Sequence, residues 1–336
     1  MSAKLLIEHA LEDVLKSFEN QGGPESLSQA IRHAVIPGGA RIRPQLCLAV
    51  AFACGNDDPK LAMGAAVALE LMHCGSLVHD DLPCFDNAEL RRGIPSVHAA
   101  YGERLAVLTG DALIVMAFES LLNAAQDSLN RLAPVMKIIA QGVGVPNGII
   151  AGQAWECEPK VNLRTYQKAK TGALFSAATS AGASAAGSDP LVWATLGDSL
   201  GEAYQVADDI RDVIGDMQSL GKPVGKDLEL DRPSATRQLG LDGAVEYFDE
   251  LVARAIRSIP ECPGQDMLKK LVLSESERLV PNALYDRVQK ELVQKSNKTS
   301  TVSGPALIVQ HNSTTLVPPG YIATVLSFGD LHVARS

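Results

Sequence analysis

Aromatic residues and strand-like patterns are both scarce in this chain of 336 residues. Only 4% of the residues are aromatic although 46% are hydrophobic, and apolar and polar residues seldom alternate before residue 300. Apolar residues instead recur at the spacing of a helix face. They do so in residues 5–18, 27–35, 60–73, 104–125 and 197–213. We therefore predict one large all-α domain, a helical bundle around a central cavity.

The chain also lacks a surplus of basic residues. It contains 30 Lys and Arg against 39 Asp and Glu, which gives a formal net charge of −9. Proteins that bind nucleic acid through its phosphates normally present a basic surface. The charge balance therefore argues against nucleic acid as a partner.

Signals for export or membrane insertion are missing too. The six cysteines show no paired spacing, which favours reduced thiols. Residues 1–15 are amphipathic and include acidic side chains, unlike a signal peptide. No window reaches the roughly 18 uncharged apolar residues of a membrane span. We expect a cytoplasmic protein without stable membrane insertion.

Two aspartate clusters stand out in this helical background. HDDLPCFDN carries Asp80, Asp81 and Asp86, and ADDIRD carries Asp208, Asp209 and Asp212. Carboxylate oxygens are the ligands that Mg²⁺ prefers, and separated sets of them can gather several ions around a polyphosphate. The clusters predict a magnesium-dependent site for a diphosphate substrate.

The spacing within the clusters differs. Asp208 and Asp212 are four residues apart and share one helix face, whereas Asp80 and Asp86 are six apart and diverge on an unbroken helix. Pro83 disfavours helical geometry at the residue before it, so we predict a break that returns Asp86 to the side of Asp80. Solvated helix faces are the alternative, which is weaker for two clusters than for one.

Basic residues follow each cluster at short range. Guanidinium and ammonium groups complement magnesium in holding diphosphate oxygens. An ion-paired surface is the alternative for these residues, but it would not explain the further basic sites upstream and between the clusters. Arg91 and Arg92 follow the first cluster, and Lys222 and Lys226 follow the second. Arg41 and Arg43 of PGGARIRP lie upstream of both clusters. Lys170 lies between the clusters in AKTGALF, with the polar, uncharged Thr171 beside it and Gln205 near Asp208.

With these motifs in order, residues 25–290 resemble the trans-polyprenyl diphosphate synthases of the short-chain type. The matching motifs are GGARIRP, LMHCGSLVHDDLPCFDNAELRRG, GDALIVMAFE, GQAWE, KTGALF, YQVADDIRDVIGD and LGKPVGKD. The chain is most similar to the geranylgeranyl diphosphate synthases of bacterial carotenoid and bacteriochlorophyll pathways. This resemblance implies an isoprenoid synthase-type helical bundle and a homodimer.

The resemblance also implies a role for each site residue. Asp80, Asp86, Asp208 and Asp212 would hold magnesium, as three ions in each active site, with Asp81 and Asp209 in support. The allylic diphosphate site would contain Arg91, Lys170, Thr171, Gln205 and Lys222, and the isopentenyl diphosphate site Arg43, His73 and Arg92. Arg232 falls where the family often carries lysine.

One position departs from the family pattern. GGARIRP places Ala40 where the family has a lysine expected to contact isopentenyl diphosphate. Losing this contact would weaken binding by roughly 1 to 3 kcal/mol. We predict tuning rather than inactivation, with Arg41 or another basic side chain compensating.

The implied reaction is the head-to-tail condensation of isopentenyl diphosphate with an allylic diphosphate. Magnesium and the basic residues would draw diphosphate from the allylic substrate, and the resulting cation would be attacked by the double bond of isopentenyl diphosphate. Released diphosphate would take the proton, so no side-chain base is expected. His79 would then be structural, and the thiols of Cys74 and Cys84 would serve packing.

Product length should depend on the residues just before Asp80. The resemblance places the tail of the allylic chain beside Gly75 and Ser76, where a bulky aromatic side chain would stop growth near fifteen carbons. The small residues predict the twenty-carbon geranylgeranyl diphosphate, with farnesyl diphosphate as the alternative product.

The last forty residues change in character. Residues 306–336 contain β-branched runs, a Pro-Pro-Gly turn and few charges. We predict a helical domain over residues 1–295 and a short β-prone appendage over residues 296–336.

Two other functions compete with chain elongation. A class I terpene cyclase would carry Ser or Thr and then Glu where this chain has Asp212 and Asp216, and would need no isopentenyl diphosphate site. A non-catalytic subunit of a heteromeric synthase would have lost carboxylates or arginines, and only Ala40 points that way. Elongation is the favoured interpretation.

Overall fold

The chain folds into two compact units, residues 1–276 and residues 277–336. The computed structural model describes residues 2–36, 38–160, 163–218 and 234–280, together with five short strands between residues 300 and 335. The predicted boundary at residues 295 and 296 lies outside the described residues, so that boundary stays a prediction.

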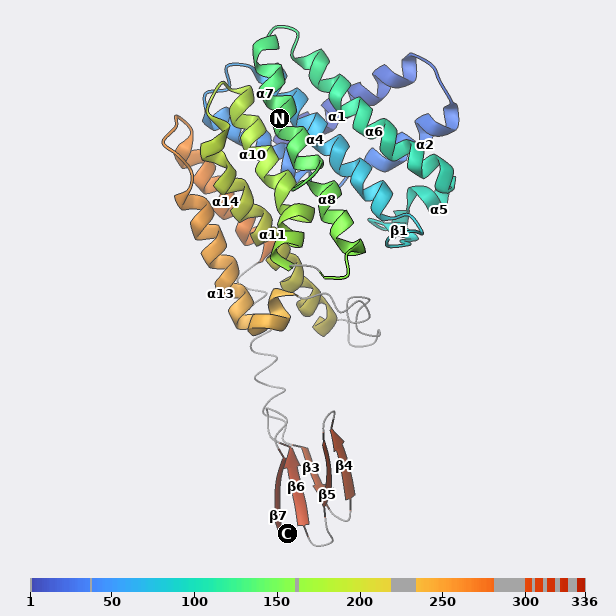
Figure 1. The fold of residues 1–336 in the computed structure, drawn as a ribbon. Helices are drawn as coiled ribbons and strands as arrows, with labels where there is room; N and C mark the ends of the chain where they lie inside the picture. Colours follow the sequence, from blue (N-terminus) through green and yellow to red (C-terminus); the bar gives the residue numbers. More distant parts are fainter. Residues whose placement is uncertain are drawn as a thin grey trace. The chain divides into compact units, whose positions relative to one another are not determined.

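The first unit is helical, as predicted (Figure 1). Its first helices are α1 (Ala3–Asn20), α2 (Glu25–Val35), α3 (Ile42–Ala53), α4 (Pro59–Asp80), α5 (Val97–Tyr101), α6 (Glu103–Ala124) and α7 (Leu129–Val143). These are followed by α8 (Ile149–Ala154), α9 (Leu163–Gln167), α10 (Ala173–Ala185), α11 (Ala194–Gln218), α13 (Ala235–Arg257) and α14 (Gln265–Leu279).

Shorter elements join these helices. A small antiparallel hairpin, β1 (Leu90–Arg91) and β2 (Ile94–Pro95), follows the first aspartate cluster. Two 3₁₀ turns, η1 (Trp155–Cys157) and η3 (Pro190–Trp193), flank a π-helical turn, η2 (Lys168–Gly172). Such π turns inside helices occur often at functional sites, and η2 contains Lys170 and Thr171.

Local sequence signals set the beginnings of several helices. The side chain of Ser2 accepts a hydrogen bond from the backbone N–H of Leu5, and that of Asp58 accepts one from Leu61, ahead of Pro59 in the first turn of α4. These are the residue types that satisfy unpaired backbone donors at a helix start.

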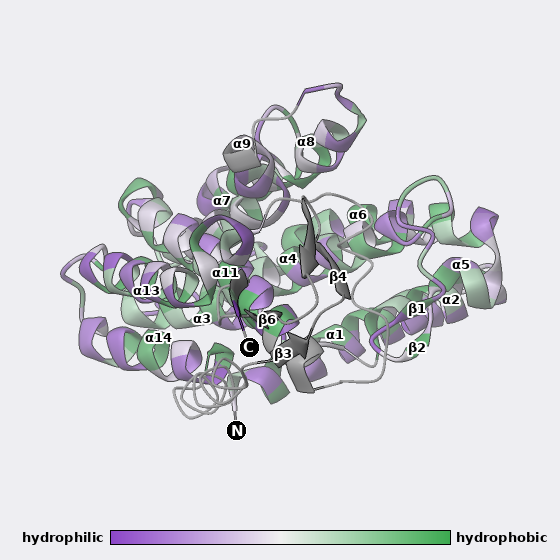
Figure 2. Ribbon diagram, turned by 90° about the horizontal axis from the view of Figure 1, so that it is seen from below, coloured by the Kyte–Doolittle hydropathy of each residue, from purple (hydrophilic) through white to green (hydrophobic). Residues whose placement is uncertain are grey.

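Helix α4 lies at the centre of the helical unit. It packs against α6, α3 and α10, and its residues are buried on nearly every side. Its largely apolar colouring in Figure 2 contrasts with the mixed colouring of α13 and α14. A helix that is apolar all round belongs in a protein core, and α4 carries Asp80 at its C-terminal end.

Two helices, α4 and α6, are long and apolar enough to cross a membrane by length and composition alone. The apolar window of α4 is 78% buried within the structure, as expected for a core helix, whereas that of α6 is 44% buried. Glu70 lies within α4 and Asp111 within α6, so neither helix contains 18 uncharged residues in a row, as expected.

The second unit contains strands, as predicted for the appendage. Its strands are β3 (Ser300–Ser303), β4 (Ala306–Gln310), β5 (Ser313–Val317), β6 (Tyr321–Val325) and β7 (Leu331–Arg335). Strand β6 pairs with both β3 and β7, and β4 pairs with β5, all antiparallel. The β-branched residues of this stretch suit such pairing.

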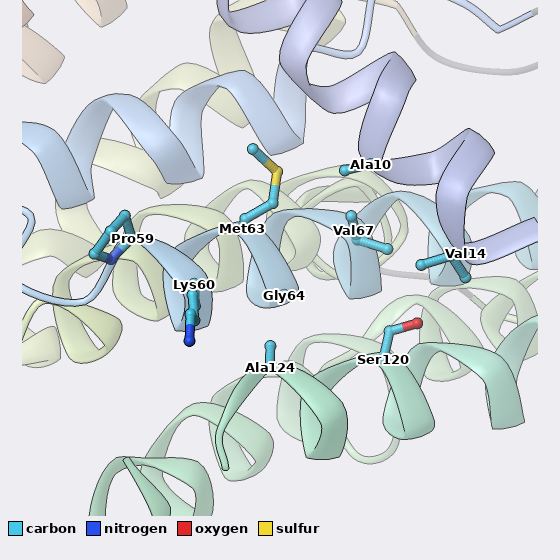
Figure 3. A pocket seen from close by; sticks show the side chains of 9 residues that line it. All are labelled: Ala10, Val14, Pro59, Lys60, Met63, Gly64, Val67, Ser120 and Ala124. Atoms are coloured by element: carbon cyan, nitrogen blue, oxygen red, sulfur yellow. The ribbon is translucent and has the colours of Figure 1, made fainter. Parts of the chain in front are cut away.

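A pocket of about 460 Å³ opens between α1, α4 and α6 (Figure 3). Its lining is mainly apolar, with Met63 and Val67 from α4 and Ala10 and Val14 from α1. These α4 residues precede Asp80 by thirteen or more positions, which is about 20 Å along a helix. The pocket is therefore separate from the first aspartate cluster.

Candidate active site

The first aspartate cluster lies where α4 ends. The helix ends at Asp80, and the following turn brings the backbone N–H of Asp86 to the carbonyl oxygen of Asp80, at 2.9 Å. The backbone N–H of Leu82 donates to His79 at 3.1 Å, which closes the last turn. The predicted break that returns Asp86 to Asp80 is confirmed.

The carboxyl group of Asp80 has a raised pKa, as expected of a carboxylate that binds a cation. The pKa of its carboxyl is raised to about 6, mainly by burial; Lys170 and Arg91 act to lower it, and the charges of Asp86 and Glu156 act to raise it. Burial of a carboxylate disfavours its charged form. A metal cation at this position would relieve that cost.

The second cluster lies on α11. Asp208 and Asp212 are within this one helix, four residues apart as predicted. Burial raises the pKa of Asp208, although Arg211 pairs with its carboxylate and lowers it. Both clusters therefore present a partly buried carboxylate that a cation would stabilise.

Arg43 connects the elements that carry the two clusters. Its Nη1 lies 3.3 Å from Nε2 of His73 on α4, and its guanidinium lies 4.7 Å from the ring centroid of Phe175 on α10. It also interacts electrostatically with Asp208 on α11. Its Nε is buried without a hydrogen-bond partner in the described structure. Such an atom needs an acceptor, and a bound phosphate oxygen is one.

Arginines surround His73. Burial lowers the pKa of His73 well below its usual value, and the charges of Arg43, Arg92, Arg41 and Arg91 lower it further. A neutral imidazole can accept a hydrogen bond from a guanidinium while adding no charge of its own. The predicted grouping of Arg43, His73 and Arg92 therefore forms one strongly positive region.

Arg41 has a different role from the one predicted. Its side chain is fully buried and donates to Glu8 at 2.9 Å, to Glu70 at 2.6 Å and to the carbonyl oxygen of Val35 at 2.7 Å. A Cβ atom on Gly38 would lie 1.9 Å from the Arg41 guanidinium, so this loop closes tightly over it. The expectation that Arg41 compensates for Ala40 is wrong, because all of these contacts face inward.

Arg92 lies at the open side of the same loop. A Cβ atom on Gly39 would come within 2.8 Å of its guanidinium, so Arg92 and the backbone next to Ala40 are in contact. Arg92 has a left-handed backbone, with φ of 54°. Arg92 is thus a basic side chain in contact with this loop, and its compensation for the missing lysine stays a prediction.

Glu156 is a site residue to which the sequence motif GQAWE gave no role. Its carboxylate accepts from Nζ of Lys170 and from the hydroxyl of Tyr166, both at 2.5 Å. It is also among the charges that raise the pKa of Asp80. Glu156 therefore fixes Lys170 beside the first cluster, and its position within a quoted motif was the signal that could have identified it.

Thr171 and Gln205, which the resemblance assigns to the allylic diphosphate site, are in contact with each other. The hydroxyl of Thr171, in η2, donates to the side-chain oxygen of Gln205, on α11, at 3.2 Å. The second aspartates of the clusters have partners of their own: Asp81 pairs with Arg91, and Asp209 accepts from the backbone N–H of Ala235 at 2.7 Å. Lys222, Lys226 and Arg232 lie outside the described residues.

Gly75 and Ser76 lie on different faces of α4. A Cβ atom on Gly75 would be 3.2 Å from the carbonyl oxygen of Gly110, so Gly75 permits close packing against α6. Ser76 lies three residues after His73 and four before Asp80, on the face that these two residues share. The chain-length role of both residues stays a prediction, and the geometry favours Ser76.

The remaining residues named from the sequence are placed as follows. His79 contacts α6, with Nε2 at 3.2 Å from the carbonyl oxygen of Val107, in keeping with a structural role. All six cysteines are free thiols; Cys74 is buried, whereas Cys84 is exposed on the turn between Asp81 and Asp86. Cys84 therefore does not serve packing in the core.

The carboxylates fit magnesium in a particular way. Among the residues that the structure describes, no three His, Cys, Asp or Glu side chains converge on one point. Magnesium usually takes one or two protein carboxylates and completes its shell with waters and substrate phosphates. Pairs such as Asp80 with Asp86 match this coordination preference.

Comparison with known proteins agrees with this geometry. The family model described as polyprenyl synthetase matches residues 24–265. A geranylgeranyl diphosphate synthase from Cereibacter sphaeroides is 51% identical over 288 residues, which cover 86% of this chain and 100% of that protein. One from Rhodobacter capsulatus is 48% identical over 272 residues, covering 81% and 94%.

Solved structures resemble the fold as well. A farnesyl/geranylfarnesyl diphosphate (FPP/GFPP) synthase from Zymomonas mobilis aligns with a TM-score of 0.66 and 30% identity, covering 80% of this chain and 97% of that one. A geranyltranstransferase from Thermotoga maritima aligns with a TM-score of 0.66 and 27% identity, covering 82% and 97%. The helical fold, the two aspartate clusters and these matches together establish that the chain belongs to the polyprenyl synthetase family.

Proposed function

We propose that this protein is a magnesium-dependent prenyltransferase that condenses isopentenyl diphosphate with allylic diphosphates, and that its main product is geranylgeranyl diphosphate. The observation that carries the proposal is the adjacency of two opposite regions. Partly buried carboxylates with raised pKa values, Asp80 and Asp208, lie next to the positive region around His73 and Arg43. Metal-bound diphosphate and a second, free diphosphate need these two environments.

Each part of the site has a task in this reaction. Asp80, Asp86, Asp208 and Asp212 would hold magnesium, as three ions in each site, and the metal supplies positive charge that stabilises the departing diphosphate. Lys170, fixed by Glu156, and Arg91, fixed by Asp81, would bind the allylic diphosphate. Lys222 would join them, by family resemblance.

The second substrate would bind in the positive region. Arg43 and Arg92 would hold isopentenyl diphosphate, and the buried Nε of Arg43 would gain an acceptor. His73 remains neutral among the arginines and orients Arg43 without adding repulsion. Positioning the double bond next to the allylic carbon supplies most of the remaining rate enhancement. The proton that is lost would pass to the released diphosphate.

We further propose a cytoplasmic homodimer in which α6 forms the contact between subunits. Leu108, Val115 and Leu122 lie seven residues apart on α6, and their exposed fractions range from 49% to 63%. Apolar residues at this spacing form a stripe along one helix face, as in packed helix pairs. A surface of this kind commonly marks a protein interface.

The deciding experiment is product analysis. Purified protein would be incubated with Mg²⁺, isopentenyl diphosphate and, in separate reactions, dimethylallyl, geranyl or farnesyl diphosphate, with products identified by mass spectrometry. A twenty-carbon diphosphate is expected from all three. Arrest at fifteen carbons would keep the elongation and overturn the product assignment. Absence of elongation by folded protein would overturn the proposal and favour a non-catalytic subunit.

A further inference from the structure

Arg41 uses all of its hydrogen-bond donors inside the protein. A guanidinium has five N–H groups and no acceptor. Nε and Nη2 donate to the two carboxylate oxygens of Glu8 at 2.9 and 3.1 Å, and Nη1 donates to Glu70 at 2.6 Å. The other N–H of Nη2 donates to the carbonyl oxygen of Val35 at 2.7 Å, and that of Nη1 lies against Sγ of Cys74 at 3.9 Å. Each donor thus has an acceptor among the described residues, and none is left for a substrate phosphate.

These contacts join four helices at the start of α3. Glu8 is in α1, Val35 is the last residue of α2, and Glu70 is in α4. Arg41 directly precedes α3, and its backbone is left-handed, with φ of 53° and ψ of 39°. A residue other than glycine keeps this conformation only where its surroundings determine it. The buried side-chain contacts of Arg41 supply that constraint, so they also fix the direction in which α3 begins.

The segment that Arg41 holds contacts the positive region of the site. A Cβ atom on Gly39 would come within 2.8 Å of the guanidinium of Arg92. The side chain of Gln45, in α3, donates to the carbonyl oxygen of Ala40 at 2.7 Å. Arg43 follows in the first turn of α3. A shift of residues 38–41 would therefore displace Arg43 and alter the contact with Arg92.

Helix α4 meets Arg41 and Arg43 with two residues of one face. Glu70 and His73 are three positions apart, which makes them neighbours on the helix surface. Glu70 accepts from Arg41, and Nε2 of His73 lies 3.3 Å from Nη1 of Arg43. The two arginines differ in their free donors, because Nε of Arg43 is buried without a hydrogen-bond partner in the described structure. Arg41 is thus the anchor of this pair, and Arg43 is the residue with a donor for a ligand.

We propose that Glu8 and Glu70 are positioning residues for isopentenyl diphosphate. Both act through Arg41, which holds the start of α3 and so places Arg43 and Arg92. Helix α1 then takes part in binding the second substrate without contacting it. Preorganised binding groups lose less entropy when a ligand binds, so a segment held in place favours affinity. The inference rests on the proposed function, since it names what sets the affinity of the second-substrate site.

The first test changes the carboxylate of α1. Glu8→Gln keeps the shape of the side chain but removes its charge and places an amide donor against the guanidinium of Arg41. It is expected to raise the KM for isopentenyl diphosphate by roughly tenfold, while kcat and the KM for the allylic diphosphate stay within about twofold of the wild type. An unchanged KM for isopentenyl diphosphate, or an equal rise of both KM values, would overturn the inference.

Glu12→Gln is the matched control for general damage to α1. Glu12 lies one turn after Glu8 and pairs with Arg32 of α2 at 2.8 Å, and its side chain is 31% exposed against 25% for Glu8. Loss of this pair should leave both KM values unchanged, whatever it does to the melting temperature. If Glu12→Gln raises the KM for isopentenyl diphosphate as much as Glu8→Gln does, the general attachment of α1 explains the effect and the inference fails.

Glu70 is tested by shortening its side chain. Glu70→Asp keeps the negative charge near Arg41 but removes one methylene group, so the carboxylate withdraws from the guanidinium. The KM for isopentenyl diphosphate is expected to rise by roughly threefold to tenfold with kcat unchanged. Thermal melts establish that the variant is folded at the assay temperature. A KM equal to that of the wild type would remove Glu70 from the positioning role.

A double-mutant cycle on Glu8 and Arg43 tests the route of the effect. In an Arg43→Gln background, Glu8→Gln should raise the KM for isopentenyl diphosphate by less than about threefold, because the main residue that it positions is gone. Additive effects of the two substitutions would show that Glu8 influences binding by another route and would overturn the inference.

Binding is also followed without turnover. The rise in melting temperature caused by isopentenyl diphosphate alone is titrated for the wild type, Glu8→Gln and Glu12→Gln. The titration midpoint should increase in Glu8→Gln by about the same factor as the KM and stay unchanged in Glu12→Gln. If the wild-type protein makes no prenyl diphosphate, the proposed function fails; if it elongates and Glu8→Gln keeps the wild-type midpoint, only this inference fails.

Discussion

At the scale of single residues, two carboxylates of the proposed site are unfavourable to the stability of the fold. Burial raises the pKa values of Asp80 and Asp208, so their charged forms lower the stability of the metal-free protein. Under the proposed function, these two charges cost stability at positions where the reaction needs them, as is typical of catalytic groups.

Asp80→Asn and Asp208→Asn are expected to reduce kcat by roughly 100- to 1,000-fold, since each would lose a charge that supports the departing diphosphate. The melting temperature without magnesium should stay equal or rise, because a buried charge is removed. Steady-state kinetics and calorimetry test this pair of effects. A variant that keeps wild-type turnover would remove that residue from the metal site.

Glu156 offers a second prediction at this scale. Glu156→Ala should free Lys170 and raise the KM for the allylic diphosphate by roughly tenfold. The matched control is Asp198→Ala, which removes a 3.0 Å pair with Lys168, two residues before Lys170 and more exposed. Kinetics of the two variants side by side check the prediction. Equal KM values for both variants would show that the Glu156 contact has no role in binding.

At the scale of elements, two adjacent residues near the C-terminal end of α4 have different surroundings. Gly75 faces α6, whereas Ser76 shares a face with His73 and Asp80. Ser76→Phe is accordingly expected to shift the product from twenty to fifteen carbons without unfolding the protein. Gly75→Tyr should instead lower the melting temperature by forcing α4 and α6 apart.

Mass spectrometry of products and thermal melts distinguish these two variants. A twenty-carbon product from Ser76→Phe would remove Ser76 from the chain-length pocket. A stable Gly75→Tyr variant that makes a fifteen-carbon product would return that role to Gly75.

The reactivity of the exposed thiol of Cys84 can report on ligand binding at the turn after α4. Burial raises the pKa values of Cys47 and Cys74 to about 12, so these thiols should resist alkylation in the native protein. Cys84 and Cys157 are exposed and should react first. Adding Mg²⁺ with inorganic diphosphate should slow the reaction of Cys84 more than that of Cys157. Peptide mass mapping measures both rates, and equal slowing would contradict a metal site at this turn.

At the scale of the whole molecule, the stripe on α6 predicts the oligomeric state. Val115→Lys combined with Leu122→Lys should convert a dimer to a monomer, because two charges would be buried at the contact. Leu191→Lys places the same charge on another exposed apolar residue and should leave the dimer intact. Light scattering after size-exclusion chromatography reports both masses. A dimer in the double variant would exclude this face of α6 as the contact.

The sequence predicted much of the molecule because its signals were local or belonged to ordered motifs. Helical periodicity predicted the bundle, and Pro83 between two aspartates predicted the turn that returns Asp86. Long-range pairing could not be predicted in this way. The burial of Arg41 depends on Glu8 and Glu70, and the environment of Gly75 depends on Gly110, contacts that a single sequence does not encode in its spacing.

The burial of Arg41 has a consequence for where this protein can be shortened. Glu8, one of its two carboxylate partners, precedes residue 24, at which the family match begins. Arg41 itself lies inside the match, two residues before Arg43. A chain trimmed to the matched region would leave this guanidinium enclosed with half of its counter-charge, so the boundary of sequence similarity and the boundary of an independently folding unit do not coincide.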